Sequence, residues 1–474
     1  MRRCFAARVP QSNNLQAYIQ HFQRNGHLRA RLDPLGLRQP LESEHTSFQL
    51  EHWQLNELEA ITGYPLDYRV TSRIQEEVHS LRDLQSYLAS TYCASVGVEF
   101  EHIQSEDERL WLYEQYENAM KEPLTPSEKI KMCQLLIRTE EMEKFLQKRF
   151  ATHKRYSSEG SESITVALNS ILAEASRTDV GTPIEYAVLG MPHRGRLATL
   201  VVVNDYPARN LFHKVKGNNE IPEEIVDRID DMPTHIAVSN TKVFSAGGSK
   251  DGNREVTLTM IHNPSHLESQ NAITMGKARA KQDDYPGGFD KNWRKVINLQ
   301  GHGDAAFTGQ GAAYEALSLC KLPKFTTNGT IHFITNNQVG FTTDSKDARS
   351  FPFASDIVKP FGTPILRVNA HDVEAVARVA KLAVRYWQTY GKDVLIDMIG
   401  FRKYGHNEVD EPAFTQPRMY EAIRAMKSVA TTYAEKLVAE GTMKEAQVTK
   451  ITEQTVGYFE EEFKASESIK PNLA

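Results

Sequence analysis

Hydrophobic residues in the second half of the chain fall in short continuous runs separated by segments with helical spacing. Val296, Ile297 and Leu299 form a short β-prone run that breaks into glycines at 301 and 303, whereas apolar residues recur at helical spacing over 312–320. A second apolar run, 331–334, stops at Asn336-Asn337. This order predicts a βαβ unit in which both strands end in polar side chains.

Similar patterns flank this unit. Continuous apolar runs predict further strands at 185–190, 256–261, 364–368 and 394–399. A helical pattern over 372–390, followed by Gly391 at the expected C-cap position, predicts a long helix between the last two. The sequence therefore predicts an α/β fold, with a parallel sheet formed by a domain over residues 151–420.

The sequence predicts helices at both ends of the chain. Residues 1–150 form a predicted helical amino-terminal region, in which one helix ends near Gly26 and another begins at Pro126. Within it, the stretch 27–35 is interpreted as structure or as an assembly surface. Residues 421–474 predict a charged, helical carboxyl-terminal linker.

Composition excludes several classes of protein. The chain has 474 residues, of which 40% are hydrophobic, enough for a large core, and its net charge of -5 gives no indication of nucleic-acid binding. No apolar run approaches the roughly 20 residues that a membrane helix needs. The 4 cysteines are scattered without a Cys-x-x-Cys pair, which predicts reduced thiols. The first residues are basic and lack acids, which favours a mitochondrial presequence.

Asp304 and Asn337 follow the two strands of the predicted βαβ unit. Because ligands bind at the carboxyl ends of strands in open α/β sheets, both side chains are predicted to face one crevice. Carboxylate, amide and backbone oxygens are hard ligands that suit Mg²⁺ or Ca²⁺, and Mg²⁺ usually takes its remaining ligands from phosphate and water. The pattern therefore predicts a metal-bridged diphosphate.

Two other interpretations use the same residues. The segment 301–306 also matches the loose Gly-x-Gly-x-x-Gly/Ala dinucleotide fingerprint. A Rossmann site needs an acidic residue after the second strand, where this chain has Asn336 and Asn337, so the nicotinamide hypothesis is the weaker one. A purely structural alternative stays open, in which Asp304 caps a helix and the asparagines form a turn.

Other candidate residues lie after the flanking strands. His193, Arg194 and Arg196 occupy a predicted strand-to-helix corner, where an imidazole and two guanidiniums suit carboxylate or phosphate oxygens. Structural ion pairs explain both arginines equally well. Ser265 and His406 also leave predicted strands at ends that face the crevice.

Five longer motifs carry a resemblance to one family. They span residues 190–197, 263–268, 301–310, 336–343 and 406–412, in this order. They are similar to those of the 2-oxoglutarate dehydrogenase E1 family, which includes the 2-oxoadipate dehydrogenases, and 154–163 is slightly more similar to the 2-oxoadipate branch. The resemblance extends from about residue 27 to the carboxyl terminus.

The resemblance implies a transketolase-like parallel-sheet domain that binds thiamine diphosphate and Mg²⁺. The implied metal ligands are Asp304, Asn337 and the backbone oxygen of Val339. The implied cofactor contacts are Arg194, Ser265, Leu267, Asp304, Ala305, Ala306, Asn337, Val339 and His406. His193 and His235 match the substrate-side catalytic histidines of the family, although a lone histidine in the position of His235 is by itself usually structural.

The implied activity is oxidative decarboxylation of a dicarboxylic 2-oxo acid, 2-oxoglutarate or 2-oxoadipate, with acyl transfer to a lipoyl-bearing E2 subunit in the mitochondrial matrix. The cofactor carries the chemistry, while the protein binds and orients it. In the family a pyrimidine domain supplies the glutamate that activates the cofactor, and this chain stops before it. We therefore expect the isolated chain to be inactive and to need a pyrimidine-domain partner or a homodimer. The alternative is a non-catalytic cofactor-binding or assembly protein of such a complex.

Overall fold

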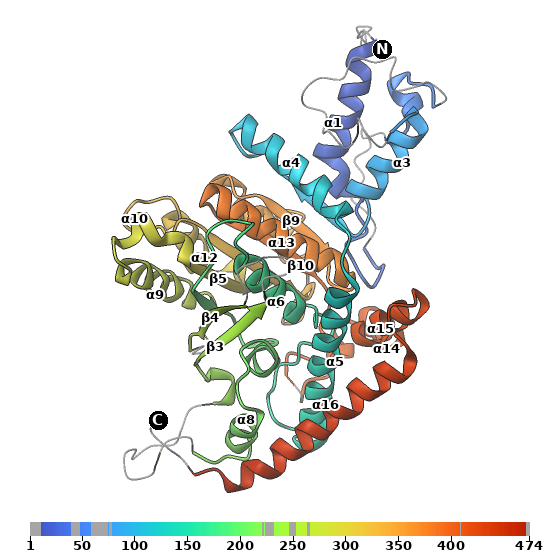
Figure 1. Cartoon of the computed structure of the whole chain (residues 1–474). Coiled ribbons are helices and arrows are strands. Elements are labelled where there is room, and N and C mark those ends of the chain that lie inside the picture. Colours follow the sequence, from blue (N-terminus) through green and yellow to red (C-terminus); the bar gives the residue numbers. More distant parts are fainter. Residues whose placement is uncertain are drawn as a thin grey trace.

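The computed structural model describes residues 11–38, 48–57, 74, 78–219, 222, 232–245, 253–262, 266–407 and 409–470. Within these residues an eight-stranded sheet runs in the order β1-β9-β10-β6-β5-β2-β4-β3 (Figure 1). Its strands are β1 (Val96–Glu99), β2 (Tyr186–Gly190), β3 (Val238–Ser245), β4 (Asn253–Met260), β5 (Val296–Gly303), β6 (Thr330–Asn336), β9 (Ile365–Asn369) and β10 (Val394–Ile399). A separate hairpin joins β7 (Val339–Gly340) to β8 (Thr343–Asp344).

The centre of the sheet is parallel and both edges are antiparallel. Strands β9, β10, β6, β5, β2 and β4 run in one direction, whereas β1 pairs antiparallel with β9 and β3 antiparallel with β4. The predicted α/β fold with a mostly parallel sheet is therefore confirmed. The sequence patterns missed both edge strands, and β1 lies inside the region that was predicted to be helical.

Helices surround the sheet. They are α1 (Gln11–Arg29), α3 (Leu81–Tyr92), α4 (Glu106–Lys121), α5 (Pro126–Arg149), α6 (Ile164–Ala175), α7 (Arg196–Ala198), α8 (Ala208–Val215), α9 (Gln270–Asp284), α10 (Gly288–Asn292), α11 (Asp304–Gly309), α12 (Gly311–Leu319), α13 (Val373–Tyr390), α14 (Pro417–Ala425), α15 (Val429–Ala439) and α16 (Glu445–Ala465). The ends of α13 follow the prediction, because the side chain of Asp372 caps its first turn and Gly391 takes a left-handed conformation after its last. Helix α1 instead runs three residues past Gly26, which packs closely against Tyr92.

Alternate side chains of the strands enter cores on opposite faces of the sheet. In β6, Ile331 and Phe333 join the main core, to which α6 and α13 contribute, whereas Ile334 joins a second core with α11 and α12. In β2, Val188 likewise points away from the main core, toward α9. Because both faces are covered, the central strands are buried along almost their whole length and are mostly apolar, which is why they could be recognised from the sequence.

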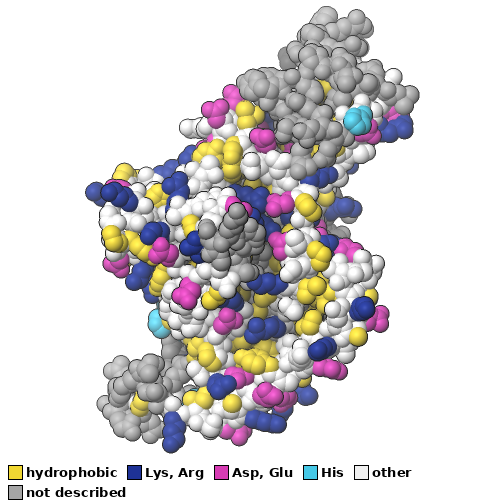
Figure 2. Space-filling model, in the orientation of Figure 1, with side chains coloured by type: hydrophobic (Ala, Val, Ile, Leu, Met, Phe, Trp, Pro, Cys, Tyr) yellow, Lys and Arg dark blue, Asp and Glu magenta, His cyan; other side chains and the backbone are white. Residues whose placement is uncertain are grey.

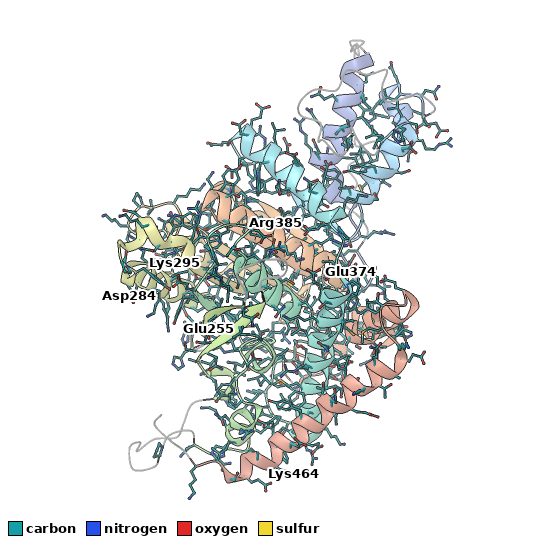
Figure 3. All side chains as sticks on the ribbon, viewed as in Figure 1. Glu255, Asp284, Lys295, Glu374, Arg385 and Lys464 are labelled. Atoms are coloured by element: carbon teal, nitrogen blue, oxygen red, sulfur yellow. The ribbon has the colours of Figure 1, made fainter. Side chains whose placement is uncertain are left out.

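Ion pairs connect α13 to the surrounding helices. Glu374 near its start accepts from Lys129 of α5 at 3.1 Å and from Lys436 of α15 at 2.9 Å (Figure 3). Arg385, five residues before its end, pairs with Glu174 of α6 at 2.7 Å. The carboxyl-terminal helix α16 packs along α5 and against α8. These contacts connect the helices at both ends of the chain to the sheet.

Basic and acidic side chains are interspersed over the face of the molecule in Figure 2. Among the described residues, no helix combines the length and the apolar character that crossing a membrane requires.

Candidate functional site

The site begins where β5 and β6 end side by side. Their parallel register pairs Gly303 with Thr335. The residues that come next, Asp304 and Asn336, therefore lie at the same edge of the sheet. Asp304 is the first residue of α11, and Asn336 donates through Nδ2 to Asp397 of β10 at 3.0 Å. The βαβ prediction therefore places Asp304 and Asn337 on one edge, as expected for a ligand crevice.

Asp304 is a buried carboxylate with little to compensate its charge. Its side chain is 4% exposed, and the nearest cation is Arg349, whose Nη2 lies 3.6 Å from Oδ2. Burial raises the pKa of Asp304 to about 6, although Arg349 opposes the shift, and the neighbouring Asp397 adds to it. A carboxylate held in this way is suited to accept a cation.

The loop after β6 closes against Asp304. Asn337 Oδ1 accepts the backbone N–H of Val339 at 3.3 Å. Gly340 lies so close to α11 that a Cβ there would be 2.9 Å from the Cβ of Ala305. Ala305 and Gly340, which follow Asp304 and Val339, are therefore in contact. The predicted metal ligands thus lie on neighbouring backbone segments.

Arg349 was not identified from the sequence. Its side chain is 3% exposed, and within the described residues its Nε and Nη1 have no hydrogen-bond acceptor. A buried guanidinium with free N–H groups is an unsatisfied donor that phosphate oxygens would satisfy. No local motif indicated it, because the segment 341–353 is polar and irregular.

The donor set fits the implied cofactor. Asp304, Asn337 and the carbonyl of Val339 offer only oxygen ligands, as Mg²⁺ requires, and the unpaired N–H groups of Arg349 lie beside them. A metal with bound phosphates would satisfy both the carboxylate and the guanidinium.

A group of aromatic rings forms a second part of the site. The ring of His193 lies 4.1 Å from that of Tyr156 and 5.7 Å from that of His406, and Phe341 lies 5.8 Å from His406, all between centroids. Tyr156 is held at a φ of 47°, a conformation that non-glycine residues rarely adopt. The sequence predicted His193 and His406 but missed Tyr156 and Phe341, since isolated aromatic residues carry no periodic signal.

His193 is neutral at physiological pH. Burial lowers its pKa to about 3, and the charge of Arg194 and the neighbouring imidazoles of His406 and His235 act in the same direction. A neutral imidazole can donate one hydrogen bond and accept another, but it cannot attract a carboxylate by charge. The structure also brings His235 within electrostatic range of His193, although far apart in sequence.

The two arginines of the strand-to-helix corner have different roles. Arg196 is fully buried and donates through Nη2 to the carbonyl of Ile236 at 2.7 Å, so it supports the fold, and it makes no ion pair with any described residue. Arg194 is half-buried and donates to the carbonyls of Ser157 and His406, each at 3.2 Å. Arg194 therefore joins the loops that carry Tyr156 and His406. Of the two arginines, only Arg194 stays a candidate for binding carboxylate or phosphate oxygens.

The segment after β4 is described in part. Ser265 lies outside the described residues. Leu267, which the structure describes, is half-buried. Glu268 follows with a φ of 69° and accepts from the buried His302 of β5, Nδ1 to Oε2, at 2.7 Å. This bond connects the segment carrying Leu267 to the strand that ends in Asp304.

Residues 137–473 match a family model described as dehydrogenase E1 component. The chain is 39% identical over 450 residues to the probable 2-oxoadipate dehydrogenase complex component E1 homolog of Dictyostelium discoideum. The matched residues cover 94% of this chain and 47% of that protein. It is 38% identical over 467 residues to the 2-oxoglutarate dehydrogenase E1 component of Brucella anthropi, covering 96% of this chain and 45% of that protein. The chain spans about half the length of the curated relatives it matches.

Proposed function

Because this chain belongs to the dehydrogenase E1 component family, we propose that it is the part of a 2-oxo acid dehydrogenase E1 that holds the diphosphate end of thiamine diphosphate through Mg²⁺. The observation that supports this most directly is the buried Asp304 at the end of β5, next to an arginine with unpaired N–H groups. In a site with only a structural role, the desolvation cost of both groups would be compensated only by their long mutual ion pair, at 3.6 Å.

Asp304, Asn337 and the carbonyl of Val339 would hold the Mg²⁺, and Arg349 would donate to the diphosphate. Further contacts of the cofactor are proposed for Arg194, Leu267, Ala305, Ala306 and His406, and for Ser265 outside the described residues. When bound, thiamine diphosphate supplies the carbanion that attacks the keto carbon and then accepts the electron pair as CO₂ leaves.

The neutral His193 and the nearby His235 would orient the substrate by hydrogen bonds. A neutral imidazole does not attract the second carboxylate of the substrate by charge, so a cation is needed to bind it. Arg194, whose guanidinium bonds to the carbonyl of His406 in this ring cluster, is the cation proposed for this role. The names of the relatives support a dicarboxylic 2-oxo acid, 2-oxoglutarate or 2-oxoadipate, as substrate of the whole enzyme. Acyl transfer to a lipoyl-bearing E2 in the mitochondrial matrix, with a pyrimidine domain from a partner or a second copy, completes the proposal.

Replacing Asp304 with asparagine tests the metal assignment. Asp304→Asn keeps the shape but removes the charged ligand, so the affinity for thiamine diphosphate at fixed Mg²⁺ should fall at least tenfold by calorimetric titration. The matched control is Asp397→Asn, which removes a buried carboxylate from the same edge without removing a proposed ligand. Equal affinity of the parent and Asp304→Asn would refute the assignment.

The second candidate is a cofactor-binding protein without turnover. It is distinguished by measuring decarboxylation of 2-oxoglutarate and 2-oxoadipate with the chain alone and with a separately made pyrimidine domain. Turnover that appears on mixing, and that Asp304→Asn abolishes, supports the enzyme. Cofactor binding without turnover in either mixture supports the non-catalytic protein.

A further inference from the structure

A segment from the amino-terminal region lies across the ligand edge of the sheet. Residues 30–38, here called the amino-terminal arm, follow α1 and pass the ends of the central strands. Asn369, at the end of β9, donates from Nδ2 to the carbonyl of Arg31 at 3.3 Å. Gln338, two residues after β6, donates from Nε2 to Asp33 Oδ1 at 2.8 Å. The arm was interpreted as structure or an assembly surface, but it contacts the proposed metal loop directly.

The carboxylate of Asp33 is fixed by its own turn. It accepts the backbone N–H groups of Leu35 at 3.0 Å, Leu37 at 2.9 Å and Arg38 at 2.9 Å. These bonds hold the side chain in one orientation before it meets Gln338. Asp33 therefore presents a rigid, charged acceptor to the loop.

Gln338 joins the arm to the sheet. Its Nε2 donates both to Asp33 Oδ1 and, at 3.0 Å, to the carbonyl of Gly400 at the end of β10. Both partners are acceptors only, so the side-chain amide can adopt only one orientation here. The side chain is buried, and its two N–H groups are both used.

The position of Gln338 matters because it lies between two proposed metal ligands, Asn337 and Val339. Its backbone has a φ of 62°, a left-handed conformation that costs free energy in a non-glycine residue. Its N–H bonds to Asn336 Oδ1 at 3.1 Å. If the bond to Asp33 is lost, the side-chain anchor of this strained residue weakens, and the directions of the flanking ligands change with it.

We infer that Asp33 is a positioning residue for the metal site, acting through Gln338. The arm holds the loop 336–340 in the conformation in which Asn337 and the carbonyl of Val339 face the same ion as Asp304. The inference rests on the proposed function, and it adds to that function a contribution from the amino-terminal region. Groups that orient metal ligands typically contribute about tenfold to a hundredfold in metal affinity.

The test uses two conservative substitutions in the full chain. Gln338→Asn keeps an amide and tolerates the left-handed backbone, but is too short by one methylene to reach Asp33. Asp33→Asn keeps the size of the side chain but weakens the acceptor. Each should raise the Mg²⁺ concentration needed for half-maximal thiamine diphosphate binding about tenfold, and saturating Mg²⁺ should restore most of the cofactor affinity. The double variant should be no worse than the more affected single variant, because both substitutions break the same bond.

The matched control is Asp372→Asn. Asp372 also accepts a backbone N–H, from Ala375 at 3.1 Å, and also lies at the ligand edge, but its side chain bonds to Ala375 and Ser95 and not, within the described residues, to the loop 336–340. It should lose stability without a change in the Mg²⁺ requirement. Amide hydrogen exchange of the cofactor-free chain gives a second reading: Asp33→Asn should reduce the protection of Gln338 and Val339 while leaving residues 331–335 protected.

Three outcomes decide the matter. An unchanged Mg²⁺ requirement in folded Asp33→Asn and Gln338→Asn, with Asp304→Asn impaired, overturns the inference and leaves the proposed function standing. Unchanged hydrogen exchange at residues 338 and 339 also overturns it, whatever the binding result. Absence of Mg²⁺-dependent binding in the parent chain defeats the proposed function and, with it, this role of Asp33.

Discussion

Two buried arginines near the ligand edge, Arg367 and Arg349, have opposite environments. Arg367 of β9 donates from Nε to Ser355 at 2.8 Å, from Nη1 to Glu99 at 2.9 Å and from Nη2 to Asp356 at 2.7 Å. Arg349 has only the distant Asp304 carboxylate, at 3.6 Å, and leaves Nε and Nη1 without an acceptor among the described residues. Both arginines lie within electrostatic range of Asp397.

The difference in environment predicts that Arg367 contributes to stability and Arg349 to ligand binding. A buried charge costs several kcal/mol unless hydrogen bonds and opposite charges compensate it, and Arg367 is compensated by the fold itself. Among the described residues Arg349 is compensated only in part, by Asp304, which suits a role in binding an anionic group. The same substitution at the two positions should therefore affect different measurements.

Arg367→Met should have the largest effect, on the free energy of unfolding. It leaves Glu99 and Asp356 without their guanidinium, although Lys359 still pairs with both, at 2.7 and 3.0 Å. We expect a loss of about 3 kcal/mol at pH 7 in urea denaturation. A loss below about 1 kcal/mol would mean that the network is not structural.

The pH dependence checks the cause. Burial raises the pKa of Glu99, but the charges of Arg367, His27 and Lys359 outweigh it and lower the pKa from 4.5 to about 2. A lowered carboxyl pKa adds stability that is present above about pH 4.5 and is lost as the pH falls toward 2. The difference between Arg367→Met and the parent should therefore shrink as the pH falls through this range.

Arg349→Met should leave stability nearly unchanged and weaken cofactor binding. Met removes the desolvation cost of the guanidinium and breaks only its long ion pair to Asp304, at 3.6 Å, so the two effects oppose each other and urea denaturation should change by less than about 1 kcal/mol. A charged hydrogen bond to phosphate contributes about 1.5–3 kcal/mol, which corresponds to a loss of roughly tenfold to hundredfold in thiamine diphosphate affinity. If Arg349→Met destabilised the protein as much as Arg367→Met and still bound the cofactor normally, the distinction between the two arginines would be wrong.

Sequence patterns predicted the part of the fold that depends on local periodicity. The strands β5, β6 and β10 were predicted because their buried runs are continuous, and α13 because its apolar stripe lies between Asp372 and Gly391. The edge strand β1 has only four residues, and its partner β9 lies some 270 residues further along the chain. Neither a period nor a turn indicates such a pairing.

The site was predictable only where polar residues end a predicted strand. Asp304 and Asn337 met that condition. Asp33 and Gln338 touch across 305 positions, and Arg349 lies in an irregular segment. Whether Arg194 or Arg196 faces the core could not be decided, because the backbone of a corner has no fixed side-chain period.

The comparison extends from arginines to carboxylates. Glu99 is surrounded by cations, whereas Glu162, in the loop that carries Tyr156, is fully buried and makes no ion pair within the described residues. Its Oε2 accepts the backbone N–H of Gly160, at 3.0 Å. Burial raises the pKa of Glu162 to about 8, and the nearby Glu159 adds to the shift. Glu162 is therefore protonated at neutral pH, while Glu99 is charged.

Glu162→Gln should have an effect of opposite sign to that of Arg367→Met, and one that grows as the pH rises. Because the folded pKa is raised from 4.5 to about 8, the parent loses stability as the pH rises between these values, and the neutral glutamine does not. Each unit of pKa difference corresponds to about 1.4 kcal/mol, so at pH 8.5 the variant should be at least about 1 kcal/mol more stable than the parent, and close to it at pH 5. Urea denaturation at both pH values measures this. A variant less stable than the parent at pH 8.5 would show that Glu162 is charged and compensated like Glu99.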